Sequence, residues 1–300
     1  MKILVTDGMD KGAQEKLVAL GHTVDNQFYE PDALGKALRD YDAVIIRSKT
    51  KIRAAQIDEA KGSKLRVIIR AGVGVDNIDV AYAEQNGIAV KNTPRASSQS
   101  VAELAMAHLF SCARFISVAG ATMRQGAWEK KVYSGGVELC GKTLGIVGFG
   151  RIGQKLCRMA KGIGMNVIAF DAFPAAENEA KFGVKYVTLD ELLAQSDFVS
   201  LHAPSADKPI IDANAIAKMK DGAILVNTSR GSNVDEAALL AALDSGKIRA
   251  AGLDVFAEEP AKNEALYSHP HVSCTPHIGA GTQEAQTRIG AEIVELITAL

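Results

Sequence analysis

The run Leu144-Gly-Ile-Val-Gly148-Phe-Gly150-Arg-Ile-Gly153-Gln-Lys-Leu156 stands near the middle of the 300-residue chain and decides its fold. An apolar strand pattern leads into a glycine-rich turn, and an amphipathic helical pattern leaves it. Gly148 suits a tight turn, Gly150 lets a phosphate approach the backbone, and Gly153 lets the helix pack against the strand. Free N–H groups at the helix N-terminus favour an anion. The run therefore predicts a dinucleotide-binding βαβ unit.

An acidic residue at the end of the next predicted strand indicates which dinucleotide is bound. Asp171 follows the third glycine by roughly 20 residues, the spacing at which a carboxylate accepts hydrogen bonds from the adenosine ribose. The same carboxylate would repel the 2′-phosphate of NADP, and residues 172–174 (Ala-Phe-Pro) contain no arginine to reverse that preference. We therefore expect NAD as the cofactor. His202, at the end of a later strand, is expected beside it.

Apolar runs alternate with helical patterns on both sides of this motif. The expected strands are 3–6, 43–46, 65–69 and 88–90, followed by 143–147, 166–170, 198–201, 223–226, 250–255 and 272–274. The expected helices include 11–20, 32–39, 80–85, 152–163 and 235–244, one long helix from 98 to about 123, and a last helix over 283–300. Apolar strands joined by helical crossovers indicate parallel sheets covered on both faces.

The expected fold is therefore α/β, with two doubly wound parallel-sheet domains. A Rossmann NAD domain, residues 99–280, is inserted in a flavodoxin-like substrate domain formed by residues 1–98 plus 281–300. The long helix at 98 and the last helix make the two crossings between domains. Clefts between lobes are common sites for small molecules, so we expect the substrate there.

Composition narrows the class of partner. Hydrophobic residues make up 47% of the chain, charged residues 23%, and the net charge is −1, so neither nucleic acid nor a membrane is expected as a partner. No apolar run reaches the roughly 18–20 residues that span a bilayer, and no signal peptide is recognised at the start. The four cysteines form no Cys-x-x-Cys pair and no metal site is expected. These features favour a cytoplasmic protein.

Three polar residues follow apolar strands downstream of the cofactor loop, where ligands of such sheets bind. Arg230 offers a planar fork that matches a carboxylate. His277 is suited to proton transfer near neutral pH, and Glu259 to holding its tautomer. Taken singly, they resemble a surface ion pair, a turn histidine and a solvated loop acid. Their shared position favours hydride transfer at C2 of a 2-hydroxy or 2-oxo acid. His108, inside the long apolar helix, is expected to be structural.

A second glycine-rich loop, Ala71-Gly72-Val73-Gly74, also follows a strand but lacks the third glycine and opens no regular amphipathic helix. We do not expect a second dinucleotide site there. Consecutive backbone N–H groups can still form a nest for an anion, and Arg47 and Arg70 also follow strands of the first domain. They are candidate phosphate ligands, and the alternative is that both are surface charges.

These motifs together resemble the D-isomer-specific 2-hydroxyacid dehydrogenases over nearly the whole chain. The matching passages are 141–153, Asp171, His202-Ala-Pro204, Asn227-Thr-Ser-Arg230-Gly231, Asp254-Val-Phe-Ala-Glu-Glu259-Pro260 and Pro276-His277-Ile-Gly-Ala. The resemblance implies Arg230 as carboxylate anchor, His277 as acid/base and Glu259 as its partner. It implies the following cofactor contacts beyond the glycines: Arg151, Ile152, Asp171, His202, Pro204, Thr228, Ser229 and Asp254. The loop 207–211 (Asp-Lys-Pro-Ile-Ile) departs from the threonine and glycine common in the family.

Within the family, the chain is most similar to members that oxidise 3-phosphoglycerate to 3-phosphohydroxypyruvate, the entry to serine biosynthesis. The passages that carry this likeness are Arg47-Ser-Lys-Thr, 70–79, Asn92-Thr-Pro, Val101-Ala-Glu-Leu and 281–286. That likeness implies a phosphorylated substrate bound by Arg47, Ser48, Arg70, Gly72, Val73 and Gly74. The alternatives are a glyoxylate or hydroxypyruvate reductase, a D-lactate dehydrogenase, and a non-catalytic NAD-sensing protein similar to a corepressor. No regulatory domain is expected after residue 300.

The family resemblance also implies a homodimer. The insertion 125–136 is aromatic, basic and rich in glycine, and belongs to neither predicted sheet. Trp128 is a candidate anchor of the dimer interface. Lys130 and Lys131 are candidates to reach a substrate phosphate in the second subunit, and the alternative is that both are solvated.

Overall fold

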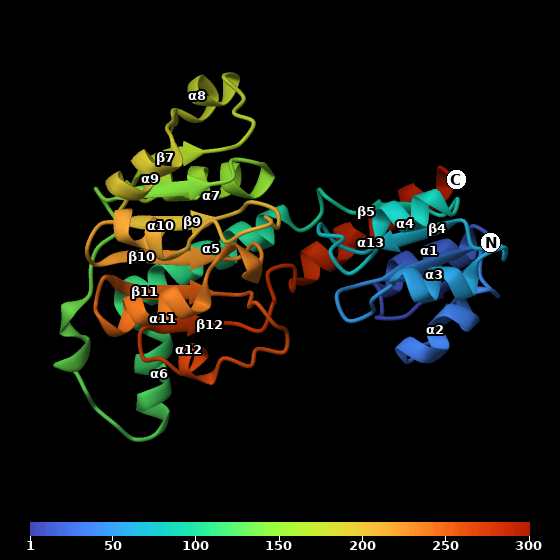
Figure 1. Cartoon of the computed structure of the whole chain (residues 1–300), viewed down its shortest axis with the longest axis horizontal. Coiled ribbons are helices and arrows are strands. Elements are labelled where there is room, and N and C mark those ends of the chain that lie inside the picture. The colour runs from blue at the N-terminus through green and yellow to red at the C-terminus, as the bar shows by residue number, and fades with distance from the viewer. The chain divides into compact units, whose positions relative to one another are not determined.

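The computed structural model describes residues 1–300 and divides the chain into two compact units. The first unit comprises Met1–Ser98 and Ala280–Leu300, and the second comprises Gln99–Gly279. Figure 1 shows helices on both faces of a sheet in each unit. All strand pairs are parallel, which confirms the predicted α/β class.

The first unit contains a five-stranded sheet with the order β2-β1-β3-β4-β5. Its strands are β1 (Lys2–Val5), β2 (Thr23–Asn26), β3 (Ala43–Ile46), β4 (Val67–Arg70) and β5 (Ala89–Asn92). Its helices are α1 (Lys11–Ala19), α2 (Pro31–Leu38), α3 (Ala54–Ala60), α4 (Val80–Gln85) and α13 (Gln283–Thr298). This strand order is the flavodoxin-like one, and its topological switch point lies between β1 and β3.

Alternate residues of these strands face two separate apolar cores, as the two-residue period of a strand requires. Ile3, Val5 and Ile45 pack with α1 and α13 on one face. Leu4 and Ile46 pack with α2, α3 and α4 on the other. The last helix of the chain thus completes the core that the first strand begins.

The second unit contains a seven-stranded sheet with the order β12-β11-β10-β9-β6-β7-β8. Its strands are β6 (Thr143–Val147), β7 (Asn166–Phe170), β8 (Lys185–Tyr186), β9 (Phe198–Leu201), β10 (Ala223–Asn227), β11 (Ile248–Leu253) and β12 (Val272–Cys274). Its helices are α5 (Ser98–Arg114), α6 (Ile116–Arg124), α7 (Arg151–Gly162), α8 (Glu177–Phe182), α9 (Leu189–Gln195), α10 (Ala213–Lys218), α11 (Glu236–Asp244) and α12 (Glu264–Tyr267). Short 3₁₀ turns, η1 and η2, cover Val132–Gly135 and Gly231–Asn233. The order is the Rossmann one with an added edge strand.

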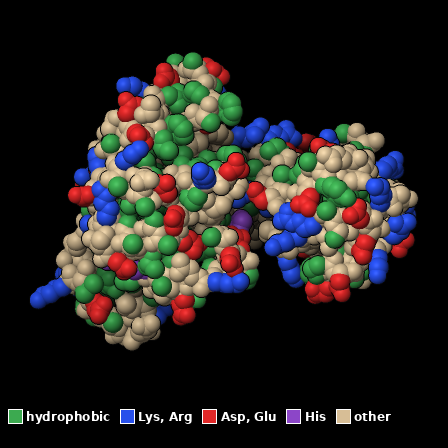
Figure 2. All heavy atoms as spheres, in the orientation of Figure 1, with side chains coloured by type: hydrophobic (Ala, Val, Ile, Leu, Met, Phe, Trp, Pro, Cys, Tyr) green, Lys and Arg blue, Asp and Glu red, His purple; other side chains and the backbone are tan.

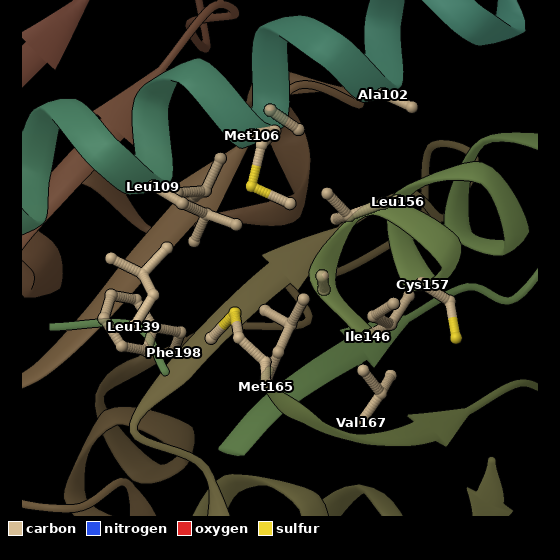
Figure 3. Close-up of a cluster of buried hydrophobic side chains, with 14 of the residues drawn as sticks. Ala102, Met106, Leu109, Leu139, Ile146, Leu156, Cys157, Met165, Val167 and Phe198 are labelled. Carbon is tan, nitrogen blue, oxygen red and sulfur yellow. The ribbon is translucent and has the colours of Figure 1, made fainter. Parts of the chain in front are cut away.

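Helix α5 covers one face of this sheet. Figure 3 shows Ala102, Met106 and Leu109 of α5 turned toward side chains from β6, α7 and β9. All of these side chains belong to one buried cluster, which also includes Phe182 of α8. Helices α9, α10, α11 and α12 supply the cluster on the opposite face. The carboxyl edge of the sheet remains for the loops that carry the polar residues.

The single long helix predicted from 98 to about 123 is wrong. Phe115 adopts a left-handed conformation with φ 59°, and α5 and α6 meet there at 68°. The Ser111 and Ser117 hydroxyls are hydrogen-bonded across the break. No single helix in the chain is long and apolar enough to cross a membrane, whereas α5 and α6 taken together meet that criterion on length and composition. Much of α5 is buried in the core cluster.

Both strands absent from the prediction are edge strands. β2 reads Thr-Val-Asp-Asn with no buried residue, and β8 has two residues. Hydrogen bonds to β1 and β7 define them. An apolar run cannot reveal such strands because they bury little.

Candidate active site

The glycine-rich loop after β6 has the predicted geometry. Gly148 has φ 91°, and a Cβ there would lie 2.7 Å from the backbone nitrogen of Ala203. A Cβ on Gly153 would lie 2.4 Å from the carbonyl oxygen of Gly148, whereas one on Gly150 would meet nothing within 4 Å. The turn is thus closed on the protein side and open at Gly150. α7 begins at Arg151 without a side-chain cap, so its first N–H groups are free for an anion.

Polar atoms near this loop fit a bound NAD. The loop lies at the topological switch point between β6 and β9, where the His202 N–H donates to the Val147 carbonyl oxygen at 2.7 Å. The Oγ of Thr228 and the Nδ1 of His202 are buried without a hydrogen-bond partner from the protein. Unsatisfied buried polar atoms are costly, and a polar ligand in the loop would satisfy them. The residues therefore fit the dinucleotide. Burial lowers the pKa of His202 to about 3, so its ring is neutral at physiological pH.

Asp171 directly follows β7 and is tied to the glycine loop. One carboxylate oxygen accepts from the Phe149 N–H at 2.7 Å, and the other accepts from the Phe173 N–H at 2.9 Å. Each oxygen retains lone pairs for further donors. The carboxylate is thereby held next to the loop, in the position suited to a ribose.

Arg230 follows β10 in a loop fixed by Asn227. The Asn227 amide accepts from the N–H and hydroxyl of Ser229 and donates to the Arg230 carbonyl oxygen at 2.8 Å. Gly231 brings this loop against the next one, because a Cβ there would lie 1.9 Å from the carbonyl oxygen of Phe256. The Arg230 loop and the segment leading to Glu259 are therefore in direct contact.

His277 and Glu259 form the predicted pair. The His277 Nδ1 lies 2.7 Å from the Glu259 Oε2. Burial raises the pKa of the Glu259 carboxyl, but the hydrogen bond and charge of His277, with the charge of Arg230, outweigh it and leave the pKa below its usual value. An ionised carboxylate only accepts, so Nδ1 carries a proton and Nε2 is directed to other groups. With side-chain exposures of 36% and 38%, the pair is accessible.

The loop that carries His277 is held by Asp254. His277 itself has φ 52°, a left-handed conformation that is uncommon outside glycine. Its N–H donates to the Asp254 carbonyl oxygen at 2.8 Å. The buried Asp254 carboxylate accepts from the N–H groups of Ile278 and Gly279 at 2.8 and 2.9 Å. The predicted cofactor contact of Asp254 stays a prediction; in the structure its carboxylate binds this loop.

In the first unit, Arg47 follows β3 at the switch point of the sheet. Its backbone N–H donates to an oxygen of Asp7 at 2.8 Å, and Asn77 donates to its carbonyl oxygen at 2.7 Å. Ser48 is exposed in the same loop. The β3–β4 register places Ile46 opposite Arg70, so Arg47 and Arg70 follow neighbouring strands at the same edge.

The Arg70 guanidinium lies over Gly72. A Cβ on Gly72, which has φ 151°, would lie 1.3 Å from the Arg70 Nη1, and that nitrogen donates to the Ala71 carbonyl oxygen at 3.2 Å. Val73 is exposed and Gly74 half-buried in the loop that follows. Figure 2 shows acidic and basic side chains interspersed over the visible face of each unit. On this face, a site for an anion is therefore a local arrangement of side chains.

Sequence reasoning missed the residues that hold these loops. Asn233, wholly buried, donates to the carbonyl oxygens of Ala203 and Pro204 and so joins two cofactor loops. The Asp7 carboxylate accepts from the N–H groups of Arg47 and Thr50, and Asn227 binds Ser229 and Arg230 within its own loop. A sequence signal exists for Asp7 and Asn227, an acid shortly after a buried strand and an amide at the end of one, whereas Asn233 lies in the turn η2. No group of three or more His, Cys, Asp or Glu side chains has an arrangement that could hold a metal ion.

Comparisons with known proteins agree with this geometry. Residues 106–279 match the family model described as "D-isomer specific 2-hydroxyacid dehydrogenase, NAD binding domain". A hydroxypyruvate reductase of Thermotoga maritima is 48% identical over 99% of this chain and 97% of its own length. A D-3-phosphoglycerate dehydrogenase of Methanocaldococcus jannaschii is 45% identical over 99% of this chain, which spans only 57% of that relative's length. A glyoxylate reductase from Paecilomyes thermophila has a TM-score of 0.90 and 32% identity, covering 100% of this chain and 94% of its own.

These matches confirm the predicted family, cofactor and enzyme class. The sheet orders, the glycine-rich loop and the His–Glu pair are features that such a family member needs. The chain therefore belongs to the D-isomer-specific 2-hydroxyacid dehydrogenases and is an NAD-dependent oxidoreductase of that family.

Proposed function

We propose that this enzyme oxidises 3-phosphoglycerate at C2 to 3-phosphohydroxypyruvate, and so acts in serine biosynthesis. The observation that carries the proposal is the pair of arginines, Arg47 and Arg70, at the carboxyl edge of neighbouring strands in the first unit. Two guanidinium groups and the N–H groups of a glycine-rich loop suit a phosphate. The four free cysteines favour a reducing compartment such as the cytoplasm.

The chemistry at C2 is assigned to the second unit. Arg230 anchors the substrate carboxylate through its planar fork. His277 takes the hydroxyl proton on Nε2, because Nδ1 already donates to Glu259. NAD held by the glycine-rich loop after β6 would supply the hydride acceptor for C2. In the reverse direction His277 returns the proton to the carbonyl oxygen. Glu259 stabilises the protonated ring and holds its orientation.

A second candidate is hydroxypyruvate reduction. It is favoured by the Thermotoga maritima relative named hydroxypyruvate reductase, which matches this chain over nearly its full length. Hydroxypyruvate and 3-phosphohydroxypyruvate differ only in the phosphate, so the same carboxylate anchor and acid/base serve both. Phosphate recognition alone separates the two functions.

The test compares kcat/KM for reduction of 3-phosphohydroxypyruvate, hydroxypyruvate and glyoxylate, and for oxidation of 3-phosphoglycerate and D-lactate. A preference for the phosphorylated pair supports the proposal, and a preference for hydroxypyruvate replaces it with the second candidate. Arg47→Gln should lower kcat/KM for the phosphorylated substrate by roughly tenfold or more, because a charged hydrogen bond contributes about 1.5–3 kcal/mol. Lys49→Gln is the matched control, since its ammonium lies over the Phe28 ring. Equal losses of kcat/KM in both variants would show that removing any nearby positive charge weakens catalysis, so that Arg47 has no specific role in phosphate binding.

We also propose that the enzyme is a homodimer formed through residues 116–136. Ile116, Met123, Trp128 and Val132 are exposed there, and Trp128 is 80% exposed. Several exposed large apolar side chains within one short segment favour association. Trp128→Ser should therefore shift the mass measured by light scattering toward the monomer. A monomeric wild-type enzyme at micromolar concentration would contradict the proposal.

Lys130 and Lys131 are proposed to contribute to phosphate binding in the second subunit of that dimer. Changing both to alanine should raise KM for a phosphorylated substrate and leave KM for hydroxypyruvate unchanged. An equal rise in both KM values, or none, would make these lysines ordinary surface charges.

A further inference from the structure

His108 uses both ring nitrogens in a buried position that the proposed mechanism does not employ. It lies on α5 and is 3% exposed. Its Nδ1 lies 3.1 Å from the Ser273 hydroxyl and its Nε2 lies 3.0 Å from the Thr275 hydroxyl. Gly252 makes room for it, because a Cβ there would lie 2.6 Å from the His108 Cβ. The sequence places His108 among core residues, but its contacts are with the strand and loop that lead to His277.

The directions of these hydrogen bonds are fixed by Asp254. The Thr275 hydroxyl donates to the Asp254 carboxylate at 2.6 Å. A hydroxyl has one proton, so Thr275 can only accept from His108, and the His108 Nε2 must carry a proton. Burial lowers the pKa of His108, against the opposing charge of Asp254. The ring is therefore neutral, and its Nδ1 accepts from Ser273.

The chain of donors continues to the break between α5 and α6. The Ser273 hydroxyl is 2.9 Å from that of Ser117, which is 2.5 Å from that of Ser111. With Ser273 donating to His108, it accepts from Ser117. Every donor in this series then points toward Asp254. Hydrogen bonds arranged head to tail in this way polarise one another and rigidify the segment they join.

The end of the series is the loop that carries His277. Asp254 holds the N–H groups of Ile278 and Gly279, and His277 occupies a left-handed conformation that needs support from its surroundings. We propose that His108 is a positioning residue: its Nε2–H, acting through Thr275 and Asp254, fixes the loop so that the His277 ring reaches the oxygen on C2 of the substrate. This inference rests on the acid/base role proposed for His277.

The alternative is a buried histidine that only satisfies its own polar atoms and stabilises the fold. Two variants separate these roles. His108→Gln keeps an amide donor at the position of Nε2, whereas His108→Met has a similar length and no donor. Both disturb the core packing, so a purely structural role predicts similar behaviour for the two.

We expect His108→Met to lower kcat by about tenfold, since small displacements of a catalytic group reduce rates strongly. The KM for the 2-oxo acid and the NADH dissociation constant, measured by fluorescence titration, should stay unchanged because no ligand contact is lost. His108→Gln should restore most of kcat. A wild-type kcat for His108→Met, or an equally low kcat for both variants, would overturn the proposal.

A double-mutant cycle tests the route through Thr275. Thr275→Val removes the hydroxyl and keeps the shape, and should lower kcat as His108→Met does. If the two residues act as one unit, kcat of the double variant is no lower than kcat of either single variant. Fully additive losses would show that His108 does not act through Thr275 and would overturn the proposal.

His277→Ala, assayed in parallel, distinguishes failure of this inference from failure of the proposed function. An inactive His277→Ala with a fully active His108→Met rejects the positioning role alone. A fully active His277→Ala rejects the acid/base assignment itself, and with it the reason for a positioning residue.

Discussion

The two glycine-rich loops follow similar strands but differ in the atoms that their glycines face. Gly148 and Gly72 each come after a buried parallel strand and each has positive φ. A Cβ on Gly148 would meet backbone atoms of the neighbouring cofactor loop, whereas one on Gly72 would meet the guanidinium of Arg70. The first loop opens the 12-residue helix α7, while the second leads through irregular chain to the six-residue α4.

This difference separates a backbone site from a side-chain site. A helix N-terminus directly after the glycines gives a loop its own set of free N–H groups. Without such a helix, the glycine mainly makes room for a cation. The unit with the long helix therefore binds the cofactor, and the unit without it is proposed to bind the substrate phosphate through Arg47 and Arg70.

The largest expected effect belongs to the chemical step assigned to the second unit. His277→Ala should lower kcat by roughly 10²–10⁴-fold, the usual contribution of a general acid or base. NADH binding should stay near normal, because a proton carrier is lost and the glycine loop is intact. Steady-state kinetics and fluorescence titration measure the two quantities. Near-normal kcat would remove His277 from the mechanism.

Adding one methyl group to each loop tests the comparison directly. Gly148→Ala should raise the NADH dissociation constant by roughly a hundredfold, because a displaced backbone loses several phosphate contacts. Gly72→Ala should leave NADH binding unchanged and raise KM for a phosphorylated substrate. If Gly72→Ala weakens NADH binding as much, the two loops do not differ as described.

Acid should also destabilise the second unit, because His202 follows β9 at the switch point of its sheet. His202 is buried and neutral, with a pKa lowered to about 3, whereas the unfolded histidine titrates near 6.5. Its stabilising contribution is therefore complete above pH 6.5 and is lost as the pH falls toward 3. Between pH 7.5 and pH 5 this loss amounts to about 2 kcal/mol. Denaturant unfolding of wild type and His202→Gln at both pH values should show a smaller pH dependence in the variant. Equal pH dependence would contradict the buried neutral ring.

The smallest expected effect concerns cofactor choice. Asp171→Ala should narrow the preference for NAD over NADP by roughly tenfold, since a charged hydrogen bond is lost and repulsion of the 2′-phosphate disappears. Asp171→Asn is the matched variant: it removes the charge and keeps an acceptor for the Phe149 N–H. Dissociation constants for NADH and NADPH measure the preference. Equal use of both cofactors by the wild-type enzyme would defeat the assignment.

Most of the strands and helices could be predicted from apolar runs and periodic apolar patterns in the sequence. The bounds of β3, β6, β7 and β9 were predicted as the structure has them, because strands inside a sheet are buried on both faces and read as continuous apolar runs. β2 and β8 were missed since edge strands depend on a neighbour and not on their own residues. The break at Phe115 has no glycine or proline to announce it; serine hydroxyls on both sides stabilise it instead.

The catalytic candidates could be proposed from the sequence because each lies in a loop that follows a strand and has a distinctive chemistry. The supporting roles of Asp7 and Asn233 were not found, since these residues bind backbone groups far away in the sequence. His108 was assigned to the core from its apolar helix. Only tertiary contacts show that its ring faces Ser273 and Thr275.

The place of α13 in the first core has a consequence for synthesis on the ribosome. Ile289, Ile293 and Ile297 belong to the same cluster as Ile3 and Val5, although nearly the whole chain separates them. The second unit is continuous in sequence, so all of its strands emerge before α13 does. Domains fold as units during translation. The second unit can therefore finish folding first. One apolar face of the N-terminal strands stays uncovered until α13 has been synthesised.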